Sequence, residues 1–150
     1  MNRDILEQPF DPEQIKQREG NFGKKLDYAE GHSVIQRLND AFDSEWSFTM
    51  TKYELMQETD EVIVIGQLDA GGIVKSQFGS SRITRAKETG DIISLADDLK
   101  SAATDALKKA ATLLGVGFTH GENRNGGNGS GIYCGSGNGG NRNGRLTSKQ

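Results

Sequence analysis

The stretch Ser94-Leu-Ala-Asp-Asp-Leu-Lys-Ser-Ala-Ala-Thr-Asp-Ala-Leu-Lys-Lys-Ala-Ala-Thr-Leu-Leu-Gly115 decides the fold, because it predicts one long amphipathic helix. Ser94 can cap the start, Asp97 suits the positive end of the helix dipole, and Gly115 is typical of a C-terminal cap. Helical spacing places one apolar stripe along Leu95, Leu99, Ala103, Ala106, Ala110 and Leu113. We expect the opposite side to face solvent; it holds Lys100, Ser101, Thr104, Asp105, Lys108, Lys109 and Thr112.

Three segments before this helix predict β-strands. Trp46–Met50 alternates apolar and polar residues, and we expect Trp46 and Phe48 to share one buried face. Glu61–Leu68 is a β-branched run, and Ile73–Gly79 follows a short turn. Loops of a few residues favour antiparallel hairpins. The alanines of the long helix would let it lie close to this sheet.

The N-terminal part predicts further helix. Val34, Ile35, Leu38 and Phe42 fall at helical spacing within Tyr28–Phe42. We expect a short helix at about 12–18, followed by a loop. The order of helix, strands and helix predicts an α+β fold, with an antiparallel sheet of three or more strands and the long C-terminal helix packed on it.

Glycine content divides the chain of 150 residues into two parts. Ten of its 20 glycines lie in residues 121–150. We expect one folded domain over 1–120, and a disordered Gly/Asn-rich tail over 121–150 that cannot bury enough apolar surface to fold. The net charge is −3, and the tail carries +3, so the domain carries −6. That balance argues against binding nucleic acid through bulk charge.

The sequence contains no recognisable motif of an enzyme active site or a metal site. Cys134 is the only cysteine, and no pattern indicates a zinc site, a P-loop, a nucleophile elbow or a paired carboxylate site. His32 beside Glu30 is expected to make a structural hydrogen bond near a helix start. We therefore expect no enzyme, no metal and no cofactor. No apolar run approaches the ~20 residues of a membrane span. A cytoplasmic protein is expected, nucleoid-associated in a bacterial or phage setting.

Basic residues form three clusters that indicate a possible partner. The first cluster lies in residues 73–88 and consists of Lys75, Arg82, Arg85 and Lys87. The second is the adjacent pair Lys108 and Lys109. The third is Lys24 and Lys25, which precede the first main helix. Gathered in one groove, they would neutralise the phosphates of a single DNA strand. The alternative is that they are solvated surface residues. Aromatic residues could stack on bases, although most are expected in the core.

Two motifs resemble the Rad-fifty-two family of single-strand DNA annealing proteins. The first is Gly23-Lys-Lys-Leu-Asp-Tyr-Ala-Glu-Gly-His-Ser-Val-Ile35, followed by Trp46. The second is Ala102-Ala-Thr-Asp-Ala-Leu-Lys-Lys-Ala110, followed by Gly115. With the segment Pro9–Ile15, the resemblance covers about residues 6–118. It is similar to the short forms of the domain: bacterial DNA damage response protein A, mitochondrial genome maintenance proteins and phage annealases.

This resemblance implies a homo-oligomeric ring that binds single-stranded DNA in a basic groove and anneals complementary strands in double-strand break repair. It assigns Lys108 and Lys109 to that groove. Ser33 and Thr112 depart from the family pattern, where basic residues are common, so the groove is expected to be less basic. Either DNA binding is weaker, or other basic residues compensate: Arg82, Arg85, Lys87, Lys24 and Lys25. A single-strand binding protein or a recombinase is a further candidate partner. Alternatives are a protein that coats or protects DNA ends without annealing, and a small protein-interaction domain.

Overall fold

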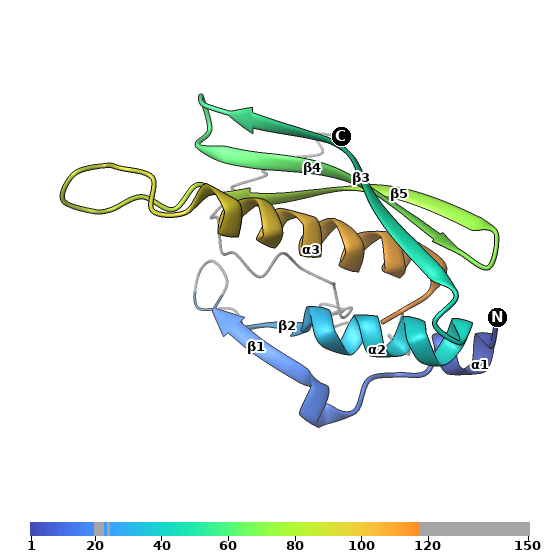
Figure 1. Ribbon diagram of the computed structural model, residues 1–150. Helices are drawn as coiled ribbons and strands as arrows, with labels where there is room; N and C mark the ends of the chain where they lie inside the picture. Colours follow the sequence, from blue (N-terminus) through green and yellow to red (C-terminus); the bar gives the residue numbers. More distant parts are fainter. Residues whose placement is uncertain (20–22, 24, 118–150) are drawn as a thin grey trace, which may run out of the picture.

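The computed structural model describes residues 1–19, 23 and 25–117, and it has the α+β architecture that the sequence predicts (Figure 1). The elements in chain order are α1 (Arg3–Leu6), a 3-10 turn η1 (Pro12–Gln14), β1 (Ile15–Glu19), β2 (Lys25–Ala29), α2 (Gly31–Phe42), β3 (Trp46–Met56), β4 (Glu61–Ala70), β5 (Ile73–Arg82) and α3 (Leu95–Leu114). The predicted tail lies outside the described residues. None of the described helices is both long and apolar enough to cross a bilayer.

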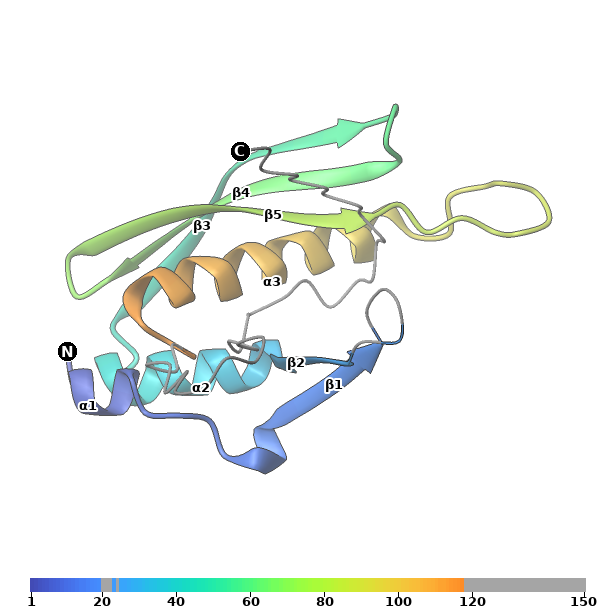
Figure 2. The ribbon, with the colours of Figure 1, turned by 180° about the vertical axis from the view of Figure 1, so that it is seen from behind.

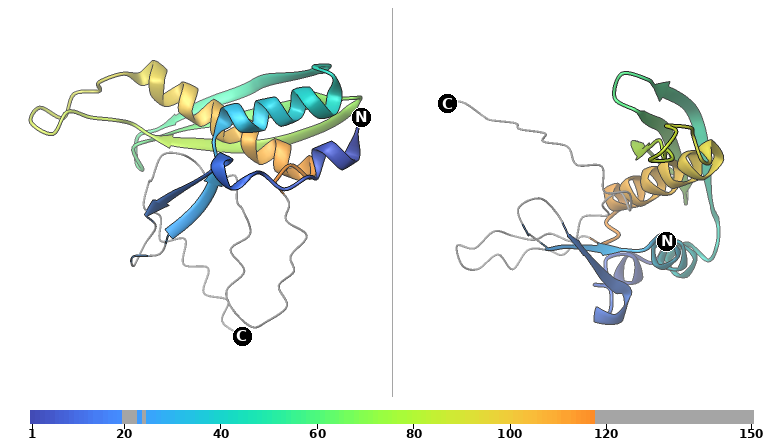
Figure 3. Two further views of the ribbon diagram at one scale, coloured as in Figure 1. Left: turned by 90° about the horizontal axis from the view of Figure 1, so that it is seen from below. Right: turned by 90° about the vertical axis from the view of Figure 1, so that its left-hand side faces the viewer.

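Three layers build the molecule, and α3 is the middle one (Figures 1 and 3). One outer layer is the antiparallel sheet β3-β4-β5. The other, called the N-terminal layer below, consists of α1, α2 and the antiparallel pair β1-β2. Each strand of the main sheet is longer than its predicted segment. Ser94 and Gly115 cap α3 as predicted, since the Ser94 side chain accepts from Asp97 N–H and Gly115 is left-handed.

Small residues let α3 lie directly on the sheet. Val62, Val64 and Leu68 alternate on the buried face of β4, as expected for a strand covered on one side. A Cβ at Gly79 would lie 2.2 Å from the carbonyl oxygen of Ala102, so only glycine permits this approach. Trp46 and Phe48 pack against the same core cluster, as predicted.

The expectation that the far side of α3 faces solvent is wrong. Lys108 is 3% exposed and Asp105 is 2% exposed, whereas Leu113 of the predicted buried stripe is 49% exposed. For Lys108 the reason is the layer order: the N-terminal layer covers the side of α3 that points away from the sheet. Asp105 instead reaches the sheet, where its carboxylate accepts a hydrogen bond from the Ser80 N–H of β5. A single helical periodicity predicts one buried side, and a middle layer has two.

The expected helix at 12–18 is also wrong. Only Pro12–Gln14 form a helical turn, and Ile15–Glu19 continue as β1. β1 pairs with β2 in the register Ile15↔Ala29, so residues of distant sequence supply its hydrogen bonds. Tertiary pairing of this kind overrides weak local helix propensity.

Candidate nucleic-acid interface

A cleft of about 520 Å³ lies between α3 and the N-terminal layer. The end of β2 and the start of α2 form one wall, and α3 forms the other. The α3 residues recur at intervals of three or four positions, so they form a row along one side of the helix. We call this site the interlayer cleft; its lining residues are Tyr28, Glu30, Gly31, Asp97, Lys100, Ser101, Thr104, Asp105 and Lys108.

Gly31 allows the two walls to approach. A Cβ at position 31 would lie 2.7 Å from Thr104 Cγ2, which is closer than such atoms come in a folded chain. Only a residue without a side chain therefore fits at position 31, where the start of α2 contacts α3. The next residue, His32, is exposed, and its Nδ1 lies 3.1 Å from Glu30 Oε2. The two side chains thus lie together at the helix start, as the sequence predicts.

Lys108 places a positive charge between the layers. Its Nζ lies 5.4 Å from the centre of the Tyr28 ring, within range of a cation–π attraction. Such an attraction is stronger when water is excluded, and Lys108 is almost fully buried. The family-like motif on α3 thus contributes its first lysine to the cleft, held by an aromatic residue from β2.

Lys109 points to a different place from Lys108. Its Nζ lies 3.0 Å from Asp105 Oδ2, and the same oxygen accepts a hydrogen bond from the backbone N–H of Ser80 on β5. Asp105 therefore joins Lys109 to the free edge of β5. Its other oxygen, Oδ1, is buried with no hydrogen-bond partner in the described part of the chain. The two adjacent lysines therefore point in different directions: Lys108 lines the interlayer cleft, and Lys109 lies toward the edge of β5.

The interlayer cleft carries charges of both signs. Lys100 and Lys108 are positive, while Glu30, Asp97 and Asp105 are negative. The charge of Asp105 is already compensated by Lys109, so the two cleft lysines face two other carboxylates. Among the described residues, this cleft is therefore not predominantly basic.

The basic residues Arg82, Arg85 and Lys87 lie at the end of β5 and in the loop that leads to α3. Arg82 ends β5 and is exposed, as is Lys87 in the loop that follows. Arg85 is engaged: its guanidinium donates to both oxygens of Asp60 at 3.0–3.1 Å and to the Gly90 carbonyl at 2.8 Å. The hydrogen bond to Asp60 raises the pKa of Arg85 above its ordinary value, so the group stays charged.

The structure brings together only part of the predicted site. Lys108 lines the interlayer cleft, whereas Lys109, Arg82, Arg85 and Lys87 do not. Lys24 and the side chain of Lys25 lie outside the described residues. The sequence analysis placed Lys100 and Thr104 on the same side of the helix as Lys108 but did not include them in the site, although their spacing of four residues was a signal for one shared stripe. In the part of the chain that the structure describes, no cluster of three acidic, histidine or cysteine residues could hold a metal.

The two positions that depart from the family-like pattern, Ser33 and Thr112, lie in defined local surroundings. Ser33 is 3% exposed, so a long basic side chain would not fit there without rearrangement. Thr112 Oγ1 donates to the Lys108 carbonyl oxygen at 2.9 Å. Neither position adds charge to the interlayer cleft.

Comparison with known proteins connects these elements to one family. The model of the Rad52/22 family double-strand break repair protein matches residues 2–125, which is more than half of the chain. The match includes every described element and both walls of the interlayer cleft. No curated protein matches the chain.

Proposed function

Because the chain belongs to the Rad52/22 family of double-strand break repair proteins, we propose that it binds single-stranded DNA at the interlayer cleft and promotes annealing of complementary strands as a homo-oligomer. The observation that carries this proposal is the placement of Lys108. Its ammonium lies over the Tyr28 ring in a cleft between two layers, on the helix motif that resembles the annealing family.

Strand annealing makes and breaks no covalent bond, so it needs no catalytic group. Pairing two strands requires that phosphate repulsion is neutralised, that each strand is extended, and that base edges stay free. Fixed lysines supply the first requirement, and aromatic faces can hold bases without reading their sequence. Tyr28 and Lys108 offer one such pair. We therefore infer a strand-pairing protein rather than an enzyme.

The acidic balance of the cleft limits how much of the strand it neutralises. Lys100 and Lys108 give two positive charges there, so a bound strand would need basic residues elsewhere. Arg82, Lys87 and Lys109 are candidates, because each has exposed surface. Lys24 and Lys25 remain in the proposal on their sequence position alone. Neighbouring copies would supply further lysines along one strand.

The test is single-strand binding by a Lys108→Gln variant at several salt concentrations. Glutamine removes the charge while retaining much of the buried chain length. We expect weaker binding and a log–log salt slope shallower by about 0.7 per lost phosphate contact. The matched control is Lys16→Gln, since Lys16 is exposed on β1 and lines no part of the cleft.

The comparison is valid only for folded protein, because Lys108 is buried. Unfolding curves of both variants therefore accompany the binding data. An unchanged affinity and salt slope in folded Lys108→Gln would contradict the cleft as the binding site. Lys109→Gln, Arg82→Gln and Lys87→Gln would then identify where the strand runs.

A further inference from the structure

The two edges of the main sheet differ within the described chain. At the edge of β5, Asp105 Oδ2 of α3 accepts a hydrogen bond from Ser80 N–H at 3.0 Å. At the edge of β3, no described strand pairs with the outer side, and residues 49–55 are exposed. Figure 2 shows the C-terminal half of β3 along the outer margin of the sheet. An unpaired edge presents backbone N–H and C=O groups to which another strand can bind.

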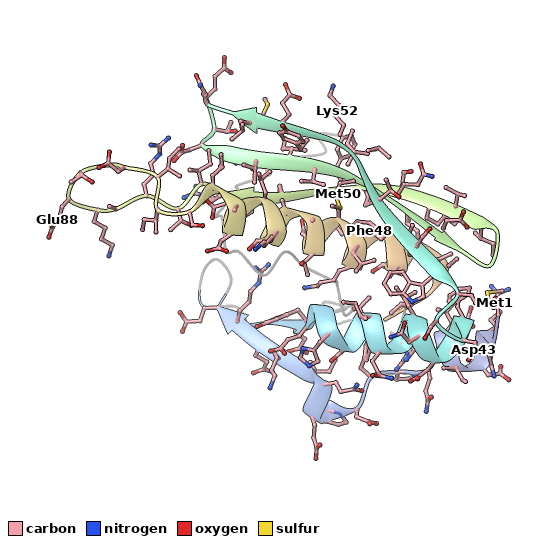
Figure 4. The ribbon with its side chains drawn as sticks, viewed as in Figure 1. Met1, Asp43, Phe48, Met50, Lys52 and Glu88 are labelled. Carbon is pink, nitrogen blue, oxygen red and sulfur yellow. The ribbon has the colours of Figure 1, made fainter. Side chains whose placement is uncertain are left out.

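Two opposite charges lie close together on this edge strand. Register places Lys52 opposite Ile65 and Glu54 opposite Ile63, so both side chains lie on the sheet face that points away from α3. Figure 4 shows Lys52 projecting from that face. Both residues are exposed, and within the described chain neither has an ion-pair partner. The residue midway between these two charges is Tyr53.

The other face of β3 exposes apolar side chains. Tyr53 and Leu55 pair with Val64 and Val62, which are buried against α3. The helix packs mainly on β5 and β4 and leaves this part of β3 uncovered. Tyr53 is therefore 64% exposed and Leu55 is 41% exposed. Apolar surface beside an unpaired strand edge favours association over contact with water.

We propose that β3 of one copy pairs antiparallel with β3 of a second copy, about a two-fold axis at Tyr53. In this register Lys52 of each copy lies opposite Glu54 of the other, which gives two opposite-charge pairs on one face. On the other face, Tyr53 lies opposite its own counterpart, and aromatic cross-strand pairs stabilise a sheet. The two three-stranded sheets become one continuous sheet.

The charge pattern selects both the register and the occupant. A strand with one positive and one negative residue two positions apart is complementary to itself only when the axis passes between them. An axis at Lys52 or at Glu54 would set like charges opposite each other, which is destabilising. The contact is therefore symmetric, the commonest arrangement in homo-oligomers. The inference rests on the proposed homo-oligomer and identifies one contact in it, whereas the interlayer cleft does not depend on this contact.

Charge reversal tests the contact by light scattering over a dilution series. Lys52→Glu and Glu54→Lys each convert both pairs to like charges, so each variant should dissociate at protein concentrations roughly tenfold higher than wild type. An equal mixture of the two variants should regain wild-type mass, because the hybrid contact contains two Glu–Lys pairs. Lys16→Glu and Glu88→Lys are the matched controls, since both positions are exposed and lie outside β3.

A cross-link tests the register. In a Cys134→Ser background, Tyr53→Cys places two thiols opposite each other across the axis, close to the separation that a disulfide bond spans. We expect a covalent dimer on a non-reducing gel. Leu55→Cys is the control, because its two thiols would lie four positions apart along the strands, about 13 Å.

Three results would overturn the β3 contact and leave the homo-oligomer standing. The first is an unchanged dissociation curve for both charge reversals, and the second is a mixture that dissociates like its two components. The third is cross-linking of Leu55→Cys as readily as Tyr53→Cys. A monomeric wild type would contradict the contact and the homo-oligomer together, while DNA binding by that monomer would leave the interlayer cleft as a valid site.

Discussion

At the residue scale, Gly31 shows how closely α2 and α3 meet. Alanine there would press against Thr104 Cγ2, at 2.7 Å. Overpacking of this kind costs about 1–3 kcal/mol, so we expect Gly31→Ala to unfold at lower urea concentration. Adding Thr104→Ser removes the obstructing methyl group and should restore most of the lost stability. Equal stability of Gly31→Ala and wild type would show that the layers are not in contact here.

Arg37 ties the N-terminal segment to α2. Its guanidinium donates to the carbonyl oxygens of Leu6, Gln8 and Pro9 and lies 4.3 Å from the centre of the Phe10 ring. Burial lowers the pKa of Arg37 from its ordinary value, although the group remains charged at neutral pH. Arg37→Met should destabilise the fold by about 1–3 kcal/mol, because buried acceptors lose their donor.

Urea unfolding measures this effect, and Lys16→Met provides a matched loss of one surface charge. The control should stay close to wild type, within about 0.5 kcal/mol. Similar curves for both variants would contradict the role assigned to Arg37.

At the element scale, two carboxylates of α3 bind the free edge of β5 and the residues that follow it. Asp98 accepts from the backbone N–H and the hydroxyl of Thr84 at 3.0 and 2.9 Å, and Asp105 accepts from Ser80 N–H. Asp98→Ala should cost about 1–3 kcal/mol and leave the Thr84 amide unprotected. Hydrogen exchange should therefore quicken at Thr84 and little at Val64. Asp97→Ala, one position along α3, should leave Thr84 exchange unchanged; equal exchange in both variants would argue against this edge contact.

Local signals predicted some features of these elements and could not predict others. Ser94 and Gly115 are caps, and cap geometry depends on neighbouring residues only. By contrast, the burial of Lys108 depends on which element covers the second side of α3. The formation of β1 depends on its pairing with β2 across a loop. The same holds for the candidate site: the motif assigned Lys108 and Lys109 to one groove, whereas their separation depends on how the layers are placed around α3.

At the scale of the whole molecule, residues 121–150 test how much of the function belongs to the domain. They carry a net +3 and half of the glycines, so they offer weak attraction to phosphates. We expect deletion of 121–150 to leave the assembly mass per copy unchanged, apart from the missing residues, and to lower DNA affinity modestly. Light scattering and oligonucleotide binding measure both. Loss of assembly on deletion would assign a structural part to the tail.

Strand pairing is the activity proposed for this chain, and a strand-annealing assay tests it most directly. Two complementary oligonucleotides with a fluorescent donor and acceptor report pairing over time. We expect wild-type protein to accelerate pairing above the spontaneous rate and Lys108→Gln to lose much of that acceleration. Binding of both strands with no acceleration would contradict annealing and leave a coating or end-protecting protein. Neither binding nor acceleration would contradict the DNA-binding account altogether and favour a protein-interaction domain.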